Sequence, residues 1–342
     1  MPDSLAERLL HWFDQYGRKD LPWQQARTPY RVWLSEIMLQ QTQVVTVVAY
    51  FQRFVTAYPS LAQLAAAPLD AVLALWSGLG YYSRARNLHR SAQLCMTQHG
   101  GELPAEFAAL AALPGIGPST AGAILAQAHA QRHAILDGNV KRVLARFHGV
   151  QGWPGTAAVQ KQLWTFAQCH TPHERLPDYT QAIMDLGATL CTRAKPRCSA
   201  CPLADDCVAL RDGLTATLPQ RKPSRTLPTR KTLMLVLRDP NGRILLQRRP
   251  PTGVWAQLWS LPEACDLADA QHHAGADAQL QPLAPFVHTF SHYRLDVAPF
   301  TAAIAAPAAI ADDADSRWLH PAQAAQLGLP APVRKLIENL AE

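Results

Sequence analysis

The stretch CTRAKPRCSACPLADDC, residues 191–207, holds four of the seven cysteines of this 342-residue chain, at the spacing C-x6-C-x2-C-x5-C. Four thiols so close in sequence can converge on one metal centre. A structural zinc ion and an iron–sulfur cluster each take four cysteine ligands, and the spacing alone does not separate them. A disulfide-bonded loop is less favoured because nothing in the sequence indicates secretion. The predicted metal ligands are Cys191, Cys198, Cys201 and Cys207.

The composition is that of a soluble globular protein, with 48% hydrophobic and 17% charged residues. The net charge of +6 permits a polyanionic partner without requiring one. Charged residues interrupt the first N-terminal turns, so no signal peptide is expected, and no apolar run approaches the ~20 residues of a membrane span. We expect a cytoplasmic monomer that is not attached to a membrane.

Residues 1–211 are predicted to form a helical domain. Ser4 and Glu7 have the pattern of a capping box, and a longer apolar-striped helical region covers Arg31–Tyr58. Residues 212–228 are predicted to form a basic, proline-containing linker, either a solvated connector or a segment that also follows phosphates. The other expected helices are Leu69–Trp76, Ala85–Gln98, Ala105–Leu113, Ser119–Ala130 and Asn139–Phe147.

Residues 229–342 are predicted to form a separate, smaller α+β domain. The apolar segments Thr232–Leu237 and Arg243–Gln247 flank Asp239-Pro240-Asn241-Gly242, which is typical of a β-hairpin turn. The remaining elements expected here are a strand over Val287–Val297, a loop over Ala302–Ala314 and a closing helix over Pro332–Ala341.

A glycine-containing turn lies between two predicted helices, in LPGIGPSTA, residues 113–121. Gly115 and Gly117 permit a tight turn, and Pro118 suits the first turn of the next helix. The exposed N–H groups at such a helix start form an anion site suited to a DNA phosphate. A plain connection between helices is the alternative. The motif resembles the helix–hairpin–helix of DNA repair glycosylases.

Two carboxyl groups are candidate catalytic groups. Asp137 ends an apolar run directly before a helix, where it can act as an N-cap or stabilise a cation in a cleft. Glu36 is the only acidic residue between Asp20 and Asp70, and it lies among apolar neighbours. A solvated helix flank is the alternative. Partial burial of Glu36 would raise its pKa and allow it to donate a proton near neutral pH.

Polar and aromatic side chains accompany these carboxyl groups. Gln40, Gln41 and Thr42 follow Glu36 and suit contacts with base edges. Tyr81 follows the glycine-rich segment Gly78-Leu79-Gly80, and Arg86 follows Tyr81. Aromatic rings beside arginines suit stacking on bases and pairing with phosphates, although core packing of a tyrosine is the alternative.

Together these segments resemble the MutY family of adenine DNA glycosylases, within the helix–hairpin–helix (endonuclease III) superfamily. The resemblance covers nearly the whole chain. It implies a multidomain fold: an all-α glycosylase domain with its hairpin at 113–121 and a 4Fe-4S loop at 191–207, then a Nudix-like domain. The segments that carry it are LSEIMLQQTQV (34–44), GLGYYSRARNLH (78–89), LPGIGPSTAG (113–122), LDGNVKRV (136–143) and the cysteine spacing.

The resemblance also implies a reaction. It is base-excision repair by hydrolysis of the N-glycosidic bond of adenine opposite 8-oxoguanine or guanine in double-stranded DNA. Glu36 would protonate a flipped-out adenine, Asp137 would stabilise the sugar cation, and Asn139 and Ser119 would orient groups around it. Ser119 stands where strand-cutting relatives carry a Schiff-base lysine, so we expect a monofunctional enzyme. Lys141 is a weaker candidate for trapping an abasic sugar.

The resemblance assigns the remaining contacts as well. The C-terminal domain lacks the glutamate cluster with which a Nudix hydrolase binds magnesium, so it is expected to recognise the lesion through Phe290, Ser291 and His292. Basic residues of the first cysteine loop would face the DNA backbone. The implied DNA contacts are Trp23, Gln40, Gln41, Thr42, Tyr81, Arg86, Gly115, Gly117 and Lys141, with Arg193, Lys195 and Arg197 in the loop.

Three other functions fit parts of the sequence. An endonuclease III-like lyase acting on oxidised pyrimidines is disfavoured by Ser119 and by the added C-terminal domain. A non-catalytic binder of damaged DNA is disfavoured by the paired Glu36 and Asp137. A nucleotide-pool hydrolase is disfavoured by the missing glutamate cluster.

Overall fold

The computed structural model describes residues 4–223, 226–304, 315–324 and 326–339. The chain divides into two compact units. One comprises Met1–Ala66 and Asn87–Pro223, and the other comprises Ala67–Arg86 and Ser224–Glu342. Residues 67–86 therefore pack with the C-terminal residues, and the division after Pro223 falls within the stretch that the sequence predicts as a linker.

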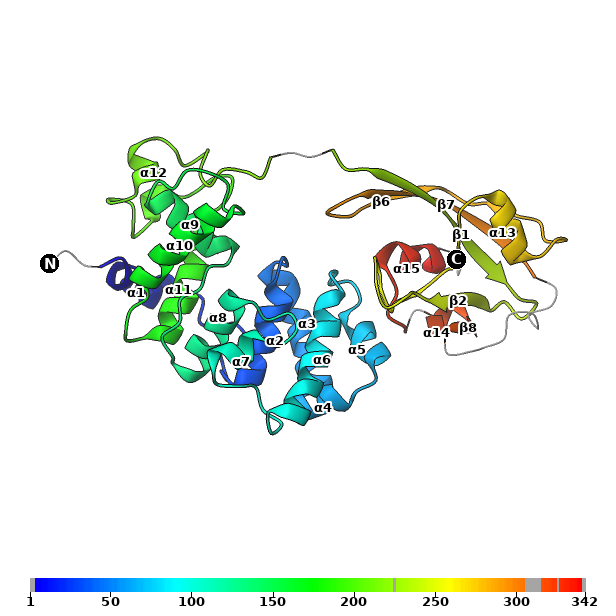
Figure 1. The fold of residues 1–342 in the computed structure, drawn as a ribbon, viewed down its shortest axis with the longest axis horizontal. Coiled ribbons are helices and arrows are strands. Elements are labelled where there is room, and N and C mark those ends of the chain that lie inside the picture. The colour runs from blue at the N-terminus through cyan, green and yellow to red at the C-terminus, as the bar shows by residue number, and fades with distance from the viewer. Residues whose placement is uncertain (1–3, 224–225, 305–314, 325, 340–342) are drawn as a thin grey trace. The chain divides into compact units, whose positions relative to one another are not determined.

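Helices build the first unit (Figure 1). Helix α1 (Leu5–Tyr16) begins with the expected capping box: the Ser4 hydroxyl accepts from the Glu7 N–H at 3.2 Å, and the Glu7 carboxylate accepts from the Ser4 N–H at 2.5 Å. Helix α6 (Ser83–Gln98) starts in the second unit and continues into the first. The others are α4 (Leu61–Ala66), α7 (Phe107–Ala111), α8 (Pro118–His129), α9 (Gly138–Phe147), α10 (Ala157–His170), α11 (Leu176–Thr189), the 3-10 turn Cys198–Ala200 and α12 (Val208–Arg211).

The apolar-striped helical region expected over Arg31–Tyr58 consists of two helices. Helix α2 (Pro29–Leu39) ends before the polar turn of residues 40–43, and α3 (Val44–Ala57) follows it. Gln41 in this turn has φ 58°, which a continuous helix cannot accommodate. The apolar stripe continues through both helices, so its periodicity does not reveal the break.

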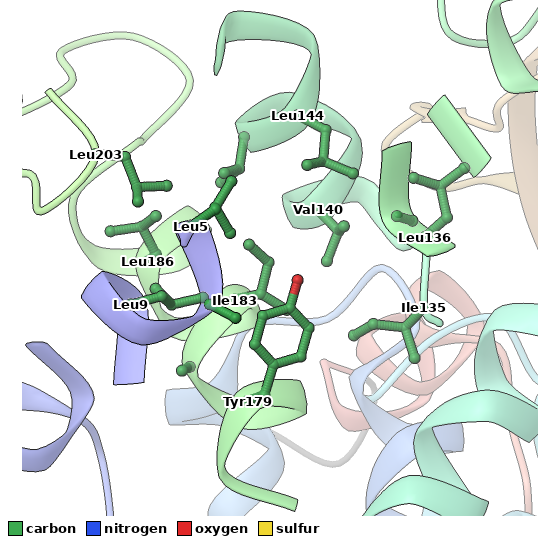
Figure 2. Packing of buried hydrophobic residues seen from close by; sticks show 14 of the residues in the cluster. Leu5, Leu9, Ile135, Leu136, Val140, Leu144, Tyr179, Ile183, Leu186 and Leu203 are labelled. Carbon is green, nitrogen blue, oxygen red and sulfur yellow. The ribbon is translucent and has the colours of Figure 1, made fainter. Parts of the chain in front are cut away.

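A cluster of buried side chains packs α1, α9 and α11 together (Figure 2). Burying one leucine or isoleucine side chain contributes about 1.5–3 kcal/mol, so the cluster fixes the start of α9 and the residues before it. Leu203 brings the cysteine loop into the same core. The labelled members are Leu5, Leu9, Ile135, Leu136, Val140, Leu144, Tyr179, Ile183, Leu186 and Leu203.

The second unit is built on one sheet with the strand order β3-β2-β1-β7-β5. Strands β1 (Thr229–Arg238) and β7 (Arg294–Ala303) pair in parallel along their full length, with Thr229 opposite Arg294. The other elements are α5 (Leu69–Trp76), β2 (Ile244–Arg248), β3 (Trp259–Ser260), β4 (Glu263–Ala264), α13 (Leu267–Ala274), β5 (Gln281–Pro282), β6 (Phe286–Thr289), β8 (Ser316–Leu319), α14 (Pro321–Ala324) and α15 (Ala331–Glu338).

The predicted hairpin is confirmed, because β1 and β2 pair antiparallel around a turn that Asp239 stabilises by accepting from the N–H groups of Asn241 and Arg243. The single strand predicted over Val287–Val297 is wrong. The segment contains the end of β6 and the start of β7, joined by a turn in which Phe290 N–H donates to the Tyr293 carbonyl at 2.9 Å.

The other C-terminal predictions need small corrections. Ala302 and Ala303, expected in a loop, end β7, and residues 305–314 of that loop lie outside the described residues. The closing helix is α15, which starts one residue earlier than expected and ends at Glu338. In the described part of the chain, no helix combines the length and hydropathy needed to cross a bilayer.

Candidate active site

One cavity in the first unit brings Glu36 and Asp137 together, although they come from distant segments. It has a volume of about 160 Å³ and is lined by side chains of α2, α8, α9 and α11. A protein cavity of about 150 Å³ can hold a benzene molecule, so this one has room for an aromatic ring. The predicted site residues that line it are Trp23, Glu36, Gln40, Thr42, Ser119, Asp137 and Asn139.

Glu36 is held on α2 between buried neighbours. Its carboxyl group accepts a hydrogen bond from Nε2 of Gln127 at 3.0 Å. Burial, with a smaller contribution from the charge of Asp137, raises the pKa of Glu36 to about 7, while the Gln127 hydrogen bond acts in the opposite direction. A carboxyl group with this pKa can release and take up a proton near neutral pH.

Asp137 is the N-cap of α9. One of its oxygens accepts from the Val140 N–H at 2.8 Å, and the other accepts from Nδ2 of Asn139 at 3.3 Å. Burial raises the pKa of Asp137, which works against the ionised form expected from the sequence. The hydrogen bonds from Val140 and Asn139, the helix start and the nearby Arg142 favour that form.

Ser119 and Asn139 both make hydrogen bonds that hold the cavity wall. The Ser119 hydroxyl accepts from the Leu136 N–H at 2.9 Å, so it fixes the residue before Asp137. Asn139 Oδ1 accepts from Arg142 at 2.7 Å. The same guanidinium donates to the Cys191 carbonyl at 2.7 Å, so α9 joins the cavity to the cysteine loop.

The turn after α2 lies against the glycine hairpin. Gln40 Nε2 donates to the Gly115 carbonyl at 3.3 Å. Gly115 has φ 80°, and a Cβ there would lie 3.0 Å from Cβ of Asn87, so a side chain would be both strained and crowded. The Gln41 side chain is exposed, and its backbone is in the left-handed region at φ 58°. This conformation is uncommon for residues other than glycine and recurs at functional sites.

The other predicted DNA contacts of this unit differ in exposure. Gly117 is exposed and is the N-cap of α8, with Pro118 at the first helical position. Lys141 is half-buried in the first turn of α9. Trp23 is only 3% exposed and packs edge-on against Phe51, so its ring can contact only what enters the cavity.

A second cavity, of about 430 Å³, lies in the second unit. Its lining includes Tyr81, which is 50% exposed and has φ 48°. Arg86, predicted as a DNA contact, lines the same cavity, is half-buried and donates to the Ala256 carbonyl at 2.7 Å. The predicted lesion contacts Phe290, Ser291 and His292 line the same cavity.

All four cysteines of the 191–207 loop line one small cavity, together with Arg146. Arg146 is 2% exposed, and its guanidinium lies 3.3 Å from Sγ of Cys191. A buried cation beside four thiol groups suits a centre that carries negative thiolate charge. These residues therefore fit a cysteine-ligated metal centre.

Within the described ranges, no three histidine, cysteine, aspartate or glutamate side chains lie close enough to bind a single ion. A zinc ion needs its thiolates at about 2.3 Å. Zinc and an iron–sulfur cluster both take four cysteine ligands, and the lining of this cavity fits either.

Several residues of these sites were not predicted. Gln127 follows the apolar run of residues 121–126 on α8, and a polar side chain after such a run is a signal for a buried contact. Arg142 and Arg146 are four residues apart, which places both on one face of α9. Trp255 and His288 line the second cavity, and neither belongs to a recognisable sequence motif.

Comparisons with known proteins agree with this arrangement. Residues 34–169 match the HhH-GPD superfamily of base excision DNA repair proteins, and residues 233–339 match the NUDIX domain. An adenine DNA glycosylase of Buchnera aphidicola (from Acyrthosiphon pisum) is 35% identical over 98% of this chain and 97% of its own. The chain belongs to the adenine DNA glycosylase family. The relative from Mus musculus is also 35% identical, over 92% of this chain and 74% of its own.

Solved structures share the fold of the helical part. A thermostable thymine-DNA glycosylase superposes with a TM-score of 0.55 at 26% identity, covering 60% of this chain and 95% of its own. An endonuclease III trapped in a covalent DNA intermediate superposes with a TM-score of 0.53 at 20% identity. The match covers 61% of this chain and 95% of the endonuclease chain. The predicted fold class, a helix–hairpin–helix glycosylase domain followed by a Nudix-like domain, is confirmed for this adenine DNA glycosylase family member.

Proposed function

We propose that this member of the adenine DNA glycosylase family excises adenine that lies opposite 8-oxoguanine or guanine in double-stranded DNA. The observation that carries the proposal is the cavity shared by Glu36 and Asp137, with the pKa of Glu36 raised to about 7. Adenine is a poor leaving group unless it is protonated, and the sugar becomes positively charged as the bond breaks.

The two carboxyl groups supply what this reaction needs. Glu36 donates its proton to N7 of an adenine flipped out of the duplex and then activates the attacking water. Asp137 stabilises the positive charge on the sugar from the start of α9. Trp23 packs against the base in the cavity, and exposed Gln41 fills the space left in the duplex.

The reaction ends at the abasic site. A strand-cutting glycosylase forms an imine with a lysine amine, and the Ser119 hydroxyl cannot do so. Its hydrogen bond from the Leu136 N–H instead supports a role in holding the wall of the cavity. Lys141 remains a candidate for slow trapping of the abasic sugar.

Recognition of the opposite base belongs to the second cavity in this proposal. Ser291 and His292 are exposed at the turn between β6 and β7, with Phe290 half-buried beneath them. Tyr81 on the same cavity provides a ring that can stack on a base. The protein acts as a cytoplasmic monomer on chromosomal DNA.

The cysteines Cys191, Cys198, Cys201 and Cys207 would hold a 4Fe-4S cluster, which would order the loop around it when bound. Arg193, Lys195 and Arg197 are exposed in that loop and would contact the DNA backbone. Iron and acid-labile sulfide in equal amounts in purified protein, without zinc, support this assignment. Stoichiometric zinc without sulfide contradicts it.

The central test is Glu36→Gln on a duplex with adenine opposite 8-oxoguanine. We expect binding to persist and base release in single turnover to fall by several orders of magnitude, because an amide cannot protonate adenine. Glu174→Gln, at an exposed position, is the matched control and should react at the wild-type rate. Near-normal release by Glu36→Gln would end the assignment.

The same assay separates the alternatives. Release from a thymine-glycol duplex with trapping by borohydride would indicate the lyase function. Binding without release from any duplex by the wild-type protein would indicate a damage binder.

A further inference from the structure

Aromatic rings line the second cavity in a continuous series. The Trp255 ring lies 5.5 Å from the His288 ring and 5.3 Å from the Phe290 ring, centroid to centroid. His288 and Phe290 meet edge to face at 4.5 Å, and Phe290 also packs against Tyr293 at 4.8 Å. Phe290 therefore contacts the rings of Trp255, His288 and Tyr293. Of these three, His288 and Tyr293 lie on β6 or on the turn before β7, whereas Trp255 comes from a different loop.

The loop that carries Trp255 is strained. Trp255 has φ 57° and Gln257 has φ 59°, a left-handed conformation that is rare for bulky side chains. Such strain persists only where neighbouring contacts enforce it, and it is concentrated at ligand sites.

Several hydrogen bonds enforce this conformation. The Leu258 N–H donates to the Trp255 carbonyl at 3.0 Å, and the Gln257 N–H donates to the Arg249 carbonyl at 3.2 Å. Arg86 donates to the Ala256 carbonyl at 2.7 Å. The loop is thereby fixed with the Trp255 ring directed toward the Phe290 ring.

We propose that Trp255 is a positioning residue for recognition of the base opposite adenine. It acts through Phe290: its ring, with that of His288, holds Phe290 in one orientation, and the turn then presents Ser291 and His292 in one geometry. This inference rests on the proposed function and deepens it. Edge-to-face packing of this kind is favourable beyond the area that it buries, so losing one ring frees the turn.

The test compares Trp255→Leu with the wild-type protein on two duplexes, with adenine opposite 8-oxoguanine and opposite guanine. We expect the ratio of kcat/KM for the two duplexes to fall about tenfold, mainly through KM for the 8-oxoguanine duplex. Release opposite guanine should change little, because the carboxyl groups that break the bond lie in the other cavity. Trp255→Phe retains a ring and should restore most of the ratio.

Val287→Ala is the matched control. Val287 is on β6 next to His288 but is 50% exposed and does not line the cavity, so its loss should leave the ratio unchanged. If Trp255→Leu does not fold, His288→Leu removes the other ring that holds Phe290, and the same fall in the ratio is expected.

The outcomes separate the two proposals. A wild-type protein that releases adenine equally from both duplexes overturns the proposed recognition function, and the role of Trp255 with it. A wild-type preference that Trp255→Leu retains overturns the role of Trp255 alone. The role of Trp255 is also overturned if Trp255→Phe loses the preference as fully as Trp255→Leu.

Discussion

The two carboxyl groups of the active-site cavity differ in the hydrogen bonds that they receive. Asp137 accepts from a backbone N–H and from Asn139 at a helix start, whereas Glu36 accepts from Gln127. Donors and a helix N-terminus favour the charged form. Burial raises the pKa of both groups, and these contacts favour the charged form at Asp137 more than at Glu36.

At the residue scale, we expect adenine release to slow as the pH rises through about 7, because Glu36 must be protonated to donate. Gln127→Leu removes a hydrogen bond that favours the ionised form, so the pKa of Glu36 should rise further. Single-turnover rates over a pH series give the midpoint for each protein. The variant's midpoint should lie at higher pH, and an equal or lower midpoint would contradict this role of Gln127.

Sequence motifs singled out Glu36 and Asp137 but could not show that they meet. That proximity depends on α2 packing against α8 and on α11 packing against both α8 and α9, which no local pattern encodes. The partners of these residues were missed for a related reason. The apolar run before Gln127 and the helical position of Arg142 do not identify the groups that these two side chains contact.

Helix α9 connects the active-site cavity to the cysteine loop. Asp137 caps its start, its apolar face enters the core, and Arg146 in its last turn lies against the cysteine loop. The Arg146 guanidinium donates to the carbonyls of Leu218, Thr192 and Arg193, and it is almost fully buried. Its removal would leave the buried Leu218 carbonyl and the part-buried carbonyls of Thr192 and Arg193 without this donor.

At the element scale, Arg146→Leu should lower the free energy of unfolding of the helical unit by about 3 kcal/mol or more, since an unpaired buried acceptor costs about 1–3 kcal/mol. Urea unfolding followed by circular dichroism measures this. Arg211→Leu is the matched control: the Arg211 side chain is 70% exposed and paired with Asp212, and such surface pairs contribute about 0–1 kcal/mol. Equal effects of the two substitutions would show that Arg146 is not needed to hold the loop.

A hairpin can be predicted from sequence where its turn contains residues typical of turns. The β1–β2 hairpin was predicted because Asp239-Pro240-Asn241-Gly242 marks the turn. The turn between β6 and β7 contains no glycine, proline, asparagine or aspartate from Thr289 to Tyr293, so the segment looked like one strand. Its reversal depends on Phe290 packing among other aromatic rings.

At the scale of the whole molecule, part of the stretch predicted as a linker packs against the first unit. Leu218 is 2% exposed, its carbonyl accepts from Arg146, and Lys222 lies over the Trp153 ring at 5.6 Å. Composition identified this stretch as basic and rich in proline, but it could not show which of its residues are buried. Its charge adds to the net +6 of the chain, which permits a polyanionic partner.

The charge of the cysteine loop yields a prediction about DNA affinity. If Arg193, Lys195 and Arg197 contact phosphates, replacing all three with alanine should weaken binding to every duplex by a similar factor, because phosphate contacts carry no sequence information. The slope of log K against log salt should become shallower by about one for each phosphate that the protein no longer neutralises. Fluorescence anisotropy over a salt series measures this for a lesion duplex and an undamaged duplex. Base contacts would instead give a selective loss of affinity for the lesion duplex with an unchanged slope, and that result would place these residues away from the backbone.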